Sequence, residues 1–186
     1  MKRITIAATA VMALATTALA FTAQGQRQFK EFLNGLKESP AIVSTTGTGS
    51  FQATISKDES EIDYTLTFEN LESDVRQSHI HIGHPQNSGG IVLWLCGSDT
   101  LPGPAGTPRC NQANPSDNRN GTVSGTLTAA NIQPLAVNGI AAGDWAEVVS
   151  LIRAGKTYAN VHTATLGAGE IRSQISNGDA DHGRHH

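Results

Sequence analysis

Residues 61–68 read EIDYTLTF, and their strict alternation of polar and apolar side chains decides the fold class. Successive side chains of a β-strand point to opposite faces, so the four apolar residues of this stretch share one face. A strand with one apolar and one polar face is typical of an antiparallel sheet that packs one side on a core. The stretch therefore predicts a half-buried strand in a mostly β domain.

Short runs of similar character lie on both sides of this stretch, separated by Gly, Asn, Ser and Asp. Such spacing is typical of an antiparallel β domain. The nearly continuous apolar run at 89–96 predicts a central strand that is covered on both faces. Residues 97–120 are rich in Pro, Gly, Asn and Ser and are expected to form a long loop. Further strands are expected at 49–55, 78–83, 121–127, 158–163 and 170–175.

One short helix is predicted between residues 144 and 155. Asp144 is expected to cap the first amide groups of this helix, with Glu147 three residues on in a capping-box arrangement. Gly155 is a natural stop. Four apolar residues fall at helical spacing and form one stripe that faces the core: Trp145, Val148, Val149 and Ile152.

The N-terminal segment has the features of a secretory signal peptide in the usual order. A basic start, Met1-Lys2-Arg3, precedes an apolar run over 4–19, which ends on the small residues of Ala18-Leu19-Ala20. This pattern predicts a signal peptide over 1–20 and a secreted or periplasmic protein; an uncleaved membrane anchor is the alternative. Residues 21–28 form a polar lead-in, and no later segment is apolar enough to span a bilayer.

The composition excludes two classes of partner. The full chain has 13 Lys and Arg against 16 Asp and Glu, and loss of residues 1–20 removes Lys2 and Arg3, which leaves a net charge of −5. This balance gives no electrostatic basis for binding nucleic acid or anionic membranes. The remaining length corresponds to one domain with short tails.

The chain has two cysteines, Cys96 and Cys110. In an exported protein, two cysteines at this spacing most simply form one disulfide. The bridge would staple the long loop at 97–120 and contribute about 3 kcal/mol to stability, by the loop-closure entropy of a ring this size. A pair of thiolate metal ligands is the alternative.

Three histidines in two predicted strands form the candidate metal site. His79 and His81 are two apart within 78–83, so their imidazoles project from one face about 6–7 Å apart. Two such rings can converge on one metal ion, and His162 in 158–163 completes the site if the fold brings the two strands together. Imidazole suits copper in both oxidation states, and zinc is the alternative because it also accepts three histidines and a water. Histidines that only bond to backbone groups are the structural alternative.

Several blocks of the sequence resemble, in the expected order, the CHRD domain, a repeat first recognised in chordin and widespread in exported bacterial proteins. The YANVHT and GEIRSQ blocks are the most specific. The resemblance implies a CHRD domain over 29–176, with a compact antiparallel, Greek-key-like β-sandwich and one short helix. The matching blocks are 32–40 (FLNGLKESP), 47–49 (GTG), 78–81 (SHIH), 89–92 (GGIV), 152–155 (IRAG), 158–163 (YANVHT) and 169–174 (GEIRSQ).

The same resemblance implies site residues, because the three histidines match recurrent histidines of the family. His84 departs from the family pattern, and it is either a fourth ligand, a residue that supports the ligands or an exposed loop residue. Asn160 and Thr163 are candidates for hydrogen bonds that orient the His162 ring.

The His-x-His pair also resembles that of copper/zinc superoxide dismutases, which place such a pair on one strand of a β-sandwich. Those enzymes carry an arginine after a glycine near the C-terminus that attracts the anionic substrate, and Arg172 would supply it here. Their bridging histidine and zinc-loop carboxylate have no clear counterpart, so the resemblance implies copper-only chemistry. The alternatives for Arg172 are an ion pair with Glu61, Glu147 or Asp63, or a clamp on loop carbonyl groups.

Three functions remain open from the sequence. One is a copper centre that disproportionates superoxide, one is a non-catalytic module that binds extracellular proteins, and one is a periplasmic copper carrier. Hydrolysis by zinc needs a general base, for which Glu170 is the only carboxylate to nominate. Residues 177–186 are expected to be disordered, and the histidines of this tail are assigned no role beyond weak metal capture: His182, His185 and His186.

Overall fold

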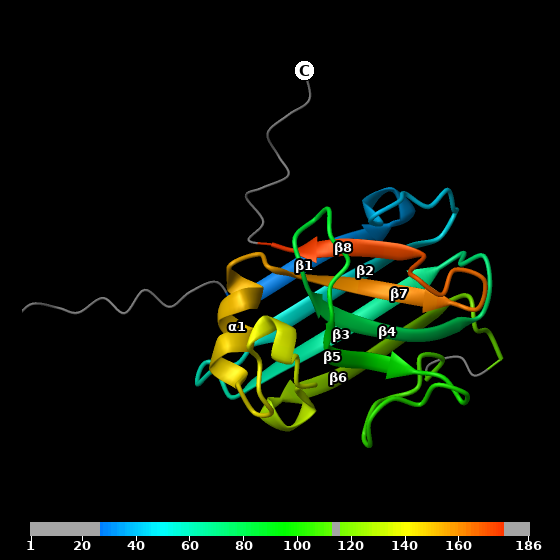
Figure 1. Cartoon of the computed structure of the whole chain (residues 1–186). Coiled ribbons are helices and arrows are strands. Elements are labelled where there is room, and N and C mark those ends of the chain that lie inside the picture. The colour runs from blue at the N-terminus through cyan, green and yellow to red at the C-terminus, as the bar shows by residue number, and fades with distance from the viewer. Residues whose placement is uncertain (1–26, 113–115, 177–186) are drawn as a thin grey trace, which may run out of the picture.

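The computed structural model describes residues 27–112 and 116–176, and within them the chain forms eight strands and one α-helix (Figure 1). The predicted signal peptide and the histidine-rich tail lie outside the described residues. The strands are β1 (Gln28–Asn34), β2 (Thr48–Ile55), β3 (Glu61–Glu69), β4 (Val75–Ile82), β5 (Ile91–Gly97), β6 (Gly121–Thr128), β7 (Thr157–Thr163) and β8 (Ile171–Ile175). The helix is α1 (Trp145–Arg153), and short 3-10 turns occupy Gly35–Lys37, Ala129–Asn131 and Ala136–Asn138.

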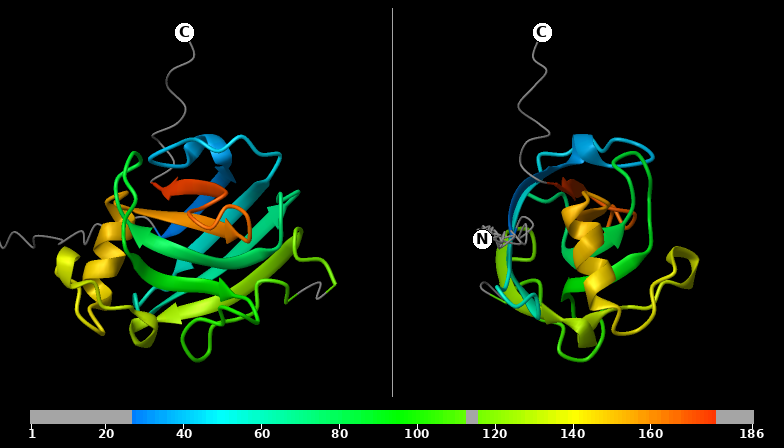
Figure 2. Two further views of the ribbon diagram at one scale, coloured as in Figure 1. Left: turned by 45° about the vertical axis from the view of Figure 1, so that its right-hand side comes forward. Right: turned by 90° about the vertical axis from the view of Figure 1, so that its left-hand side faces the viewer.

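The strands form one antiparallel sheet in the order β5-β4-β7-β8-β1-β2-β3-β6. Only Asn34 and Arg172 pair β1 with β8, so this single point joins two four-stranded halves. Figure 2 shows the sheet curling until the two halves face each other, as a nearly closed barrel. Because β7 returns to lie beside β4 after β5 and β6 intervene, the connection is of the Greek-key kind. The predicted mostly β, antiparallel fold is confirmed.

The core lies between the two halves and is built from the alternating residues that the sequence places on the apolar faces. In β3 the burial alternates along the whole strand, as the pattern of 61–68 predicts. Aliphatic side chains from both halves and from α1 fill the interior, with few aromatic rings among them. Fully buried members include Leu33, Phe51, Leu66, Phe68, Ile80, Leu93, Val148, Val161 and Ile171.

The apolar run at 89–96 does form a strand, β5. The prediction that this strand is central is wrong, because β5 is an edge strand of the sheet. Its burial comes from segments that cover it rather than from strands on both sides. The Gln133 amide donates to the Val92 carbonyl at 2.9 Å, and the Tyr64 hydroxyl donates to the Leu95 carbonyl at 2.5 Å. An edge strand can therefore read as a central one when loops and the opposite half of the sheet cover it.

Strand β1 begins at Gln28, the last residue of the predicted polar lead-in, most of which lies outside the described residues. Phe29 and Leu33 point into the core. Glu31 lies between them and interrupts the alternation of apolar and polar residues, so the sequence pattern does not identify the strand. Glu31 occupies this position because its carboxylate accepts the Ser176 amide at 2.8 Å.

The predicted helix is confirmed at Trp145–Arg153, and it covers one end of the barrel (Figure 1). The expected cap is wrong: the Asp144 carboxylate accepts the preceding Ala141 amide at 2.7 Å and makes no hydrogen bond to the helix. Gly155, with a φ of 66°, follows the helix end, a conformation that favours glycine. Among the described residues, no helix has the length and apolar character needed to cross a membrane.

Cys96 and Cys110 form the predicted disulfide, and both are buried. The bridge ties the end of β5 to the long loop that leads to β6.

Replacing both cysteines with serine is expected to lower the free energy of unfolding by about 3 kcal/mol, because the unfolded chain regains the entropy of an open loop. Urea unfolding followed by tryptophan fluorescence measures this as a lower midpoint, with an equal or steeper slope because the open unfolded chain exposes more surface. An unchanged midpoint in the serine variant would show that the bridge does not constrain the unfolded chain.

Candidate metal centre

The three histidines of the sequence prediction meet because β4 and β7 are neighbours in the sheet. In the antiparallel register, His79 lies opposite Asn160, His81 opposite Tyr158, and Gln77 opposite His162. These side chains share one face, and the alternate residues Ile80 and Val161 face the core. The histidines therefore project from the outer face of this half of the barrel, beneath the loops that follow β4 and β7.

The histidine cluster, defined as His79, His81 and His162, is compact and buried. The ring centroids are 5.3 Å apart for His79 and His81, 5.0 Å for His79 and His162, and 5.7 Å for His81 and His162. One ring nitrogen from each residue lies within 4.8 Å of those of the others. Metal–nitrogen bonds of about 2.0–2.1 Å place three nitrogens roughly 3.3–3.6 Å apart, so a closure of about 1 Å would bring these rings to one ion.

Backbone carbonyl groups fix the orientation of two of the three rings. Nδ1 of His81 donates to the Gly89 carbonyl at 2.9 Å, and Nδ1 of His162 donates to the Gly167 carbonyl at 3.1 Å. Since a carbonyl oxygen only accepts, each Nδ1 carries the proton and each Nε2 keeps its lone pair. Both Nε2 atoms, and both ring nitrogens of His79, are buried without a hydrogen-bond partner among the described residues. Lone pairs held in this way fit a metal ion.

Two aromatic side chains flank the cluster. The Trp94 ring meets His79 edge-on, with centroids 4.2 Å apart, and the Tyr158 ring stacks on His81 at 4.8 Å and an interplanar angle of 3°. The Tyr158 hydroxyl accepts the Gly89 amide at 2.9 Å, which ties the ring to the loop that orients His81. These contacts leave the imidazoles little freedom to rotate.

Burial keeps all three imidazoles neutral. It lowers the pKa of His79 to about 2, and the neighbouring His162 and His81 lower it further in the same direction. Burial likewise lowers the pKa of His81 to about 4, against the opposing effect of its bond to Gly89, and it lowers the pKa of His162. Neutral imidazole is the form that binds metal ions, so the lone pairs are available at neutral pH.

Arg172 lies next to the cluster but does not join it. Its side chain is fully buried, its Nη2 donates to the His84 carbonyl at 2.9 Å, and its guanidinium carbon lies 3.3 Å from the centroid of the Tyr158 ring. No ion pair joins it to Glu61, Glu147 or Asp63 within the part of the chain that the structure describes. Of the structural alternatives, the clamp on a loop carbonyl is the one that the geometry contains.

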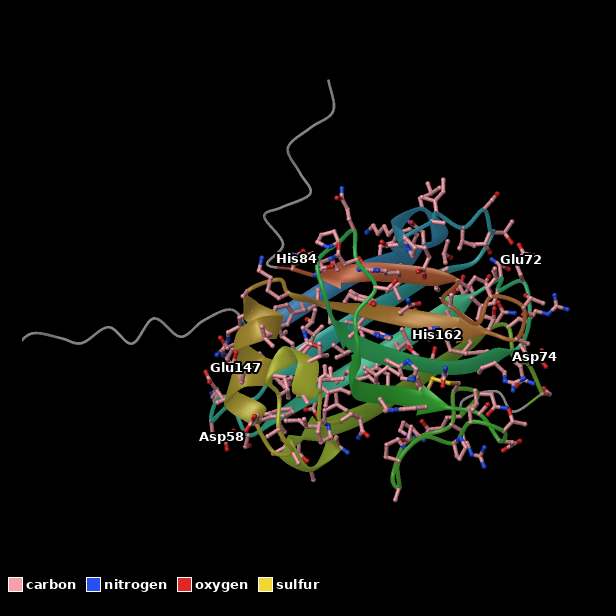
Figure 3. The ribbon with its side chains drawn as sticks, in the orientation of Figure 1. Asp58, Glu72, Asp74, His84, Glu147 and His162 are labelled. Atoms are coloured by element: carbon pink, nitrogen blue, oxygen red, sulfur yellow. A yellow bond between two sulfur atoms is a disulfide. The ribbon has the colours of Figure 1, made fainter. Side chains whose placement is uncertain are left out.

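His84 is not brought to the histidine cluster. Figure 3 shows it in the loop after β4, away from His162, and its side chain is exposed. Only its backbone takes part, as the acceptor for Arg172. Of the three alternatives for this residue, the exposed loop residue matches its position.

The two residues expected to orient His162 have other partners. The Asn160 amide donates to Glu38 at 3.4 Å, and the Thr163 hydroxyl donates to Glu170 at 2.8 Å, whereas the Gly167 carbonyl holds the ring. Glu170 also accepts the Thr45 hydroxyl and the Glu72 amide, each at 2.8 Å. This carboxylate is fully buried among fixed donors, which makes it a structural anchor rather than the general base that the sequence nominated.

Glu38 is a buried acid that sequence reasoning missed. Burial raises its pKa to about 7, while the positive charge of Arg172 and the Asn160 hydrogen bond act in the opposite direction. One of its carboxylate oxygens has no partner among the described residues. The residue follows the 3-10 turn after β1, and its only signal in the sequence is its place within the 32–40 block.

Comparison with known proteins gives one result. The CHRD domain family model matches residues 29–175, which is most of the chain and includes all three clustered histidines, Glu38 and Arg172. No curated protein and no solved structure matches the chain.

Proposed function

Because the chain belongs to the CHRD domain family, we propose that it is an exported protein in which the histidine cluster holds one copper ion, and that this centre disproportionates superoxide. The disulfide between Cys96 and Cys110 supports export, because such bonds persist in oxidising compartments. The observation that carries the proposal is the set of unpartnered, buried ring nitrogens of His79, His81 and His162, which lie within 4.8 Å of one another.

The donor set favours copper over zinc. Three neutral imidazoles suit copper, which also binds most tightly in the order of divalent metals. A hydrolytic zinc site needs a carboxylate base near the metal, whereas Glu170 is held by Thr45, Glu72 and Thr163. Copper, when bound, would supply one-electron redox chemistry, which needs no such base.

The charge of Arg172 supports a small anion as the substrate. The Tyr158 ring contacts both the Arg172 guanidinium and the His81 imidazole, so one ring links the permanent cation to the cluster. A fixed positive charge so close to a redox centre raises the encounter rate with an anion. His81 and His162 are only 7% and 6% exposed, which restricts access to very small molecules such as superoxide.

The test uses the mature chain loaded with copper, and it measures metal content and superoxide disproportionation together. His81→Ala is expected to lose stoichiometric copper and activity. Arg172→Ala is expected to keep copper but to lose most of its activity and the dependence of that activity on ionic strength. Arg109→Ala is the matched control, because Arg109 is an exposed arginine paired with Asp99. Copper without turnover in the wild type would refute the enzyme and leave a carrier, and absence of copper would refute both.

A non-catalytic binding module is the second candidate. All the ring nitrogens of the histidine cluster that have no hydrogen-bond partner among the described residues are buried. Such burial fits a structural metal ion as well as a catalytic one. In that case copper or zinc would stabilise the fold against unfolding, and superoxide would not react faster than in buffer.

A further inference from the structure

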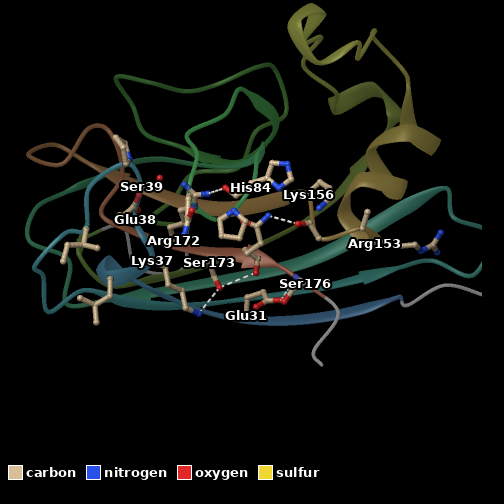
Figure 4. Close-up of a pocket in the computed structure, with 18 residues that line it drawn as sticks. Glu31, Lys37, Glu38, Ser39, His84, Arg153, Lys156, Arg172, Ser173 and Ser176 are labelled. Carbon is tan, nitrogen blue, oxygen red and sulfur yellow. Dashed lines mark hydrogen bonds between the residues drawn. The ribbon is translucent and has the colours of Figure 1, made fainter. Parts of the chain in front are cut away.

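A pocket lies beside Arg172, which is one of its lining residues. It has a volume of about 910 Å³, and Figure 4 shows the side chains that line it. The floor comes from β8 and the residue after it, and the walls come from residues 36–42, residues 84–86 and the end of α1. A pocket of this size is in the range that holds small organic ligands.

Basic groups dominate the pocket although the whole chain is acidic, with a net charge of −3. The acidic residues of the lining are Glu31 and Glu38, and burial raises the pKa of both, to about 7 for Glu38. Basic residues outnumber these two acids, and the formal charge of the lining stays positive even with Arg153 paired to Glu59. The basic residues of the lining are Lys37, Arg153, Lys156 and Arg172.

One wall of the same pocket is apolar and open to water. Leu36 and Ile42 both line the pocket and are 70% and 69% exposed. Pro40 and Pro85 extend this apolar surface. Apolar side chains beside the charged groups of one pocket provide a surface on which an apolar part of a ligand can lie.

A buried donor without a partner lies at the pocket floor. Nη1 of Arg172 has no hydrogen-bond partner among the described residues, although its residue is only 1% exposed. The other terminal nitrogen, Nη2, is held by the His84 carbonyl, so the guanidinium is fixed in place. An arginine that is pre-oriented in this way recognises carboxylate groups with little loss of entropy.

We propose that this pocket binds a small organic anion in which a carboxylate meets Arg172 and Lys156 and an apolar chain lies against Leu36 and Ile42. The charge of the lining selects the anion, and the apolar wall selects the chain. The pocket shares Arg172 with the surroundings of the metal centre, but none of the three clustered histidines lines it. Binding therefore needs no metal.

Octanoate is the probe, added to the metal-free mature chain and followed by amide chemical shifts in NMR spectra. Octanoate is expected to bind with a Kd of about 1 mM or tighter, which is the affinity of an efficient ligand of this size. The shifts should map to Leu36, Ile42, Lys156 and Ser173. Acetate, which lacks the chain, and octyltrimethylammonium, which reverses the charge, should each bind at least about tenfold more weakly.

Two exposed positions allow substitutions that leave the core intact. Lys156→Glu should weaken octanoate about threefold or more by reversing a charge, and Ile42→Ser should weaken it about three- to fivefold by removing apolar contact. Their matched controls lie outside the pocket: Lys57→Glu at an exposed turn and Val137→Ser at a side chain that is 91% exposed. Both controls should bind octanoate as the wild type does.

Three results would overturn the proposal. One is the lack of saturable shifts up to about 10 mM octanoate. Another is equal binding of octanoate and octyltrimethylammonium, or equal effects of the pocket variants and their controls. The third is a dimer that octanoate dissociates in sedimentation velocity, which would assign the pocket to a second copy of the chain. Copper content and superoxide turnover are measured separately, so failure here leaves the metal centre untouched.

Discussion

Replacing His79 with leucine is expected to abolish stoichiometric metal binding and, at the same time, to stabilise the metal-free protein. Both ring nitrogens of His79 are buried without a partner, and the residue is 0% exposed. A buried polar group without a partner costs about 1–3 kcal/mol, so a leucine of similar volume should raise the free energy of unfolding of the metal-free chain by about 1 kcal/mol or more. At the proposed metal centre, a bound ion would offset this cost by taking the lone pair of His79.

The metal-bound state should respond in the opposite direction. At a metal concentration of a thousand times Kd, binding adds about 4 kcal/mol to the stability of the wild type, and His79→Leu should show none of this gain. Loss of a ligand should weaken binding by more than the roughly 10–100-fold that supporting residues contribute. Urea unfolding with and without metal, together with metal content, measures both effects.

His84→Leu is the matched control, because this histidine is exposed and lies outside the cluster. It should keep metal content and metal-dependent stability at the wild-type level. If His79→Leu instead destabilised the metal-free chain and left metal content unchanged, the cluster would be a structural polar seam, and the metal proposal would fail.

Residue alternation carried much of the fold prediction, because the period of two in 61–68 reports directly on which side chains face the core. The prediction from alternation failed where contacts with distant parts of the chain, rather than neighbouring residues, determine which side chains are buried. Glu31 sits at an inward position of β1 because Ser176, far along the chain, supplies its hydrogen bond. The apolar run at 89–96 resembles a central strand because other segments cover this edge strand and bury it. The sequence of the run itself does not indicate those segments.

The candidate site likewise has one part that the sequence predicts from strand geometry and another that depends on the topology of the sheet. The shared face of His79 and His81 follows from strand geometry alone, whereas their meeting with His162 depends on β7 returning beside β4, which strand patterns do not reveal. Only the family resemblance implied it. For Arg172 the sequence offered both an acidic partner and a clamp on a loop carbonyl, and the structure contains the clamp, on His84. The contact with the Tyr158 ring was not predicted, because it depends on how β7 and β8 pair.

Acid should destabilise the metal-free protein steeply below pH 6.5. The folded-state pKa values of His79 and His81, about 2 and 4, lie below the ordinary value of 6.5, and that of His162 is also lowered. As the pH falls below 6.5, these imidazoles are protonated in the unfolded chain but stay neutral in the folded chain. His79 and His81 then each remove about 1.4 kcal/mol of stability per pH unit, and His162 acts in the same direction.

Glu38 acts against this trend, because its pKa is raised from 4.5 to about 7. Its contribution to stability is complete below pH 4.5 and is lost as the pH rises through about 7, so acidification over this window returns about 1.4 kcal/mol per pH unit. His79 and His81 against this one carboxyl leave a net loss of about 1.4 kcal/mol per pH unit between pH 6.5 and 4.5, and the lowered pKa of His162 adds to the loss.

Two variants separate the contributions in urea unfolding curves of the metal-free chain at pH 7.0, 6.0 and 5.0. Glu38→Gln removes the opposing carboxyl and should steepen the loss by about 1.4 kcal/mol per pH unit, whereas His79→Leu should reduce it by about 1.4 kcal/mol per pH unit. A wild-type stability that stayed flat between pH 6.5 and 5 would mean that the imidazoles take up protons in the folded state. They would then not be the neutral ligands that a metal at this centre requires, because a protonated imidazole has no lone pair to offer.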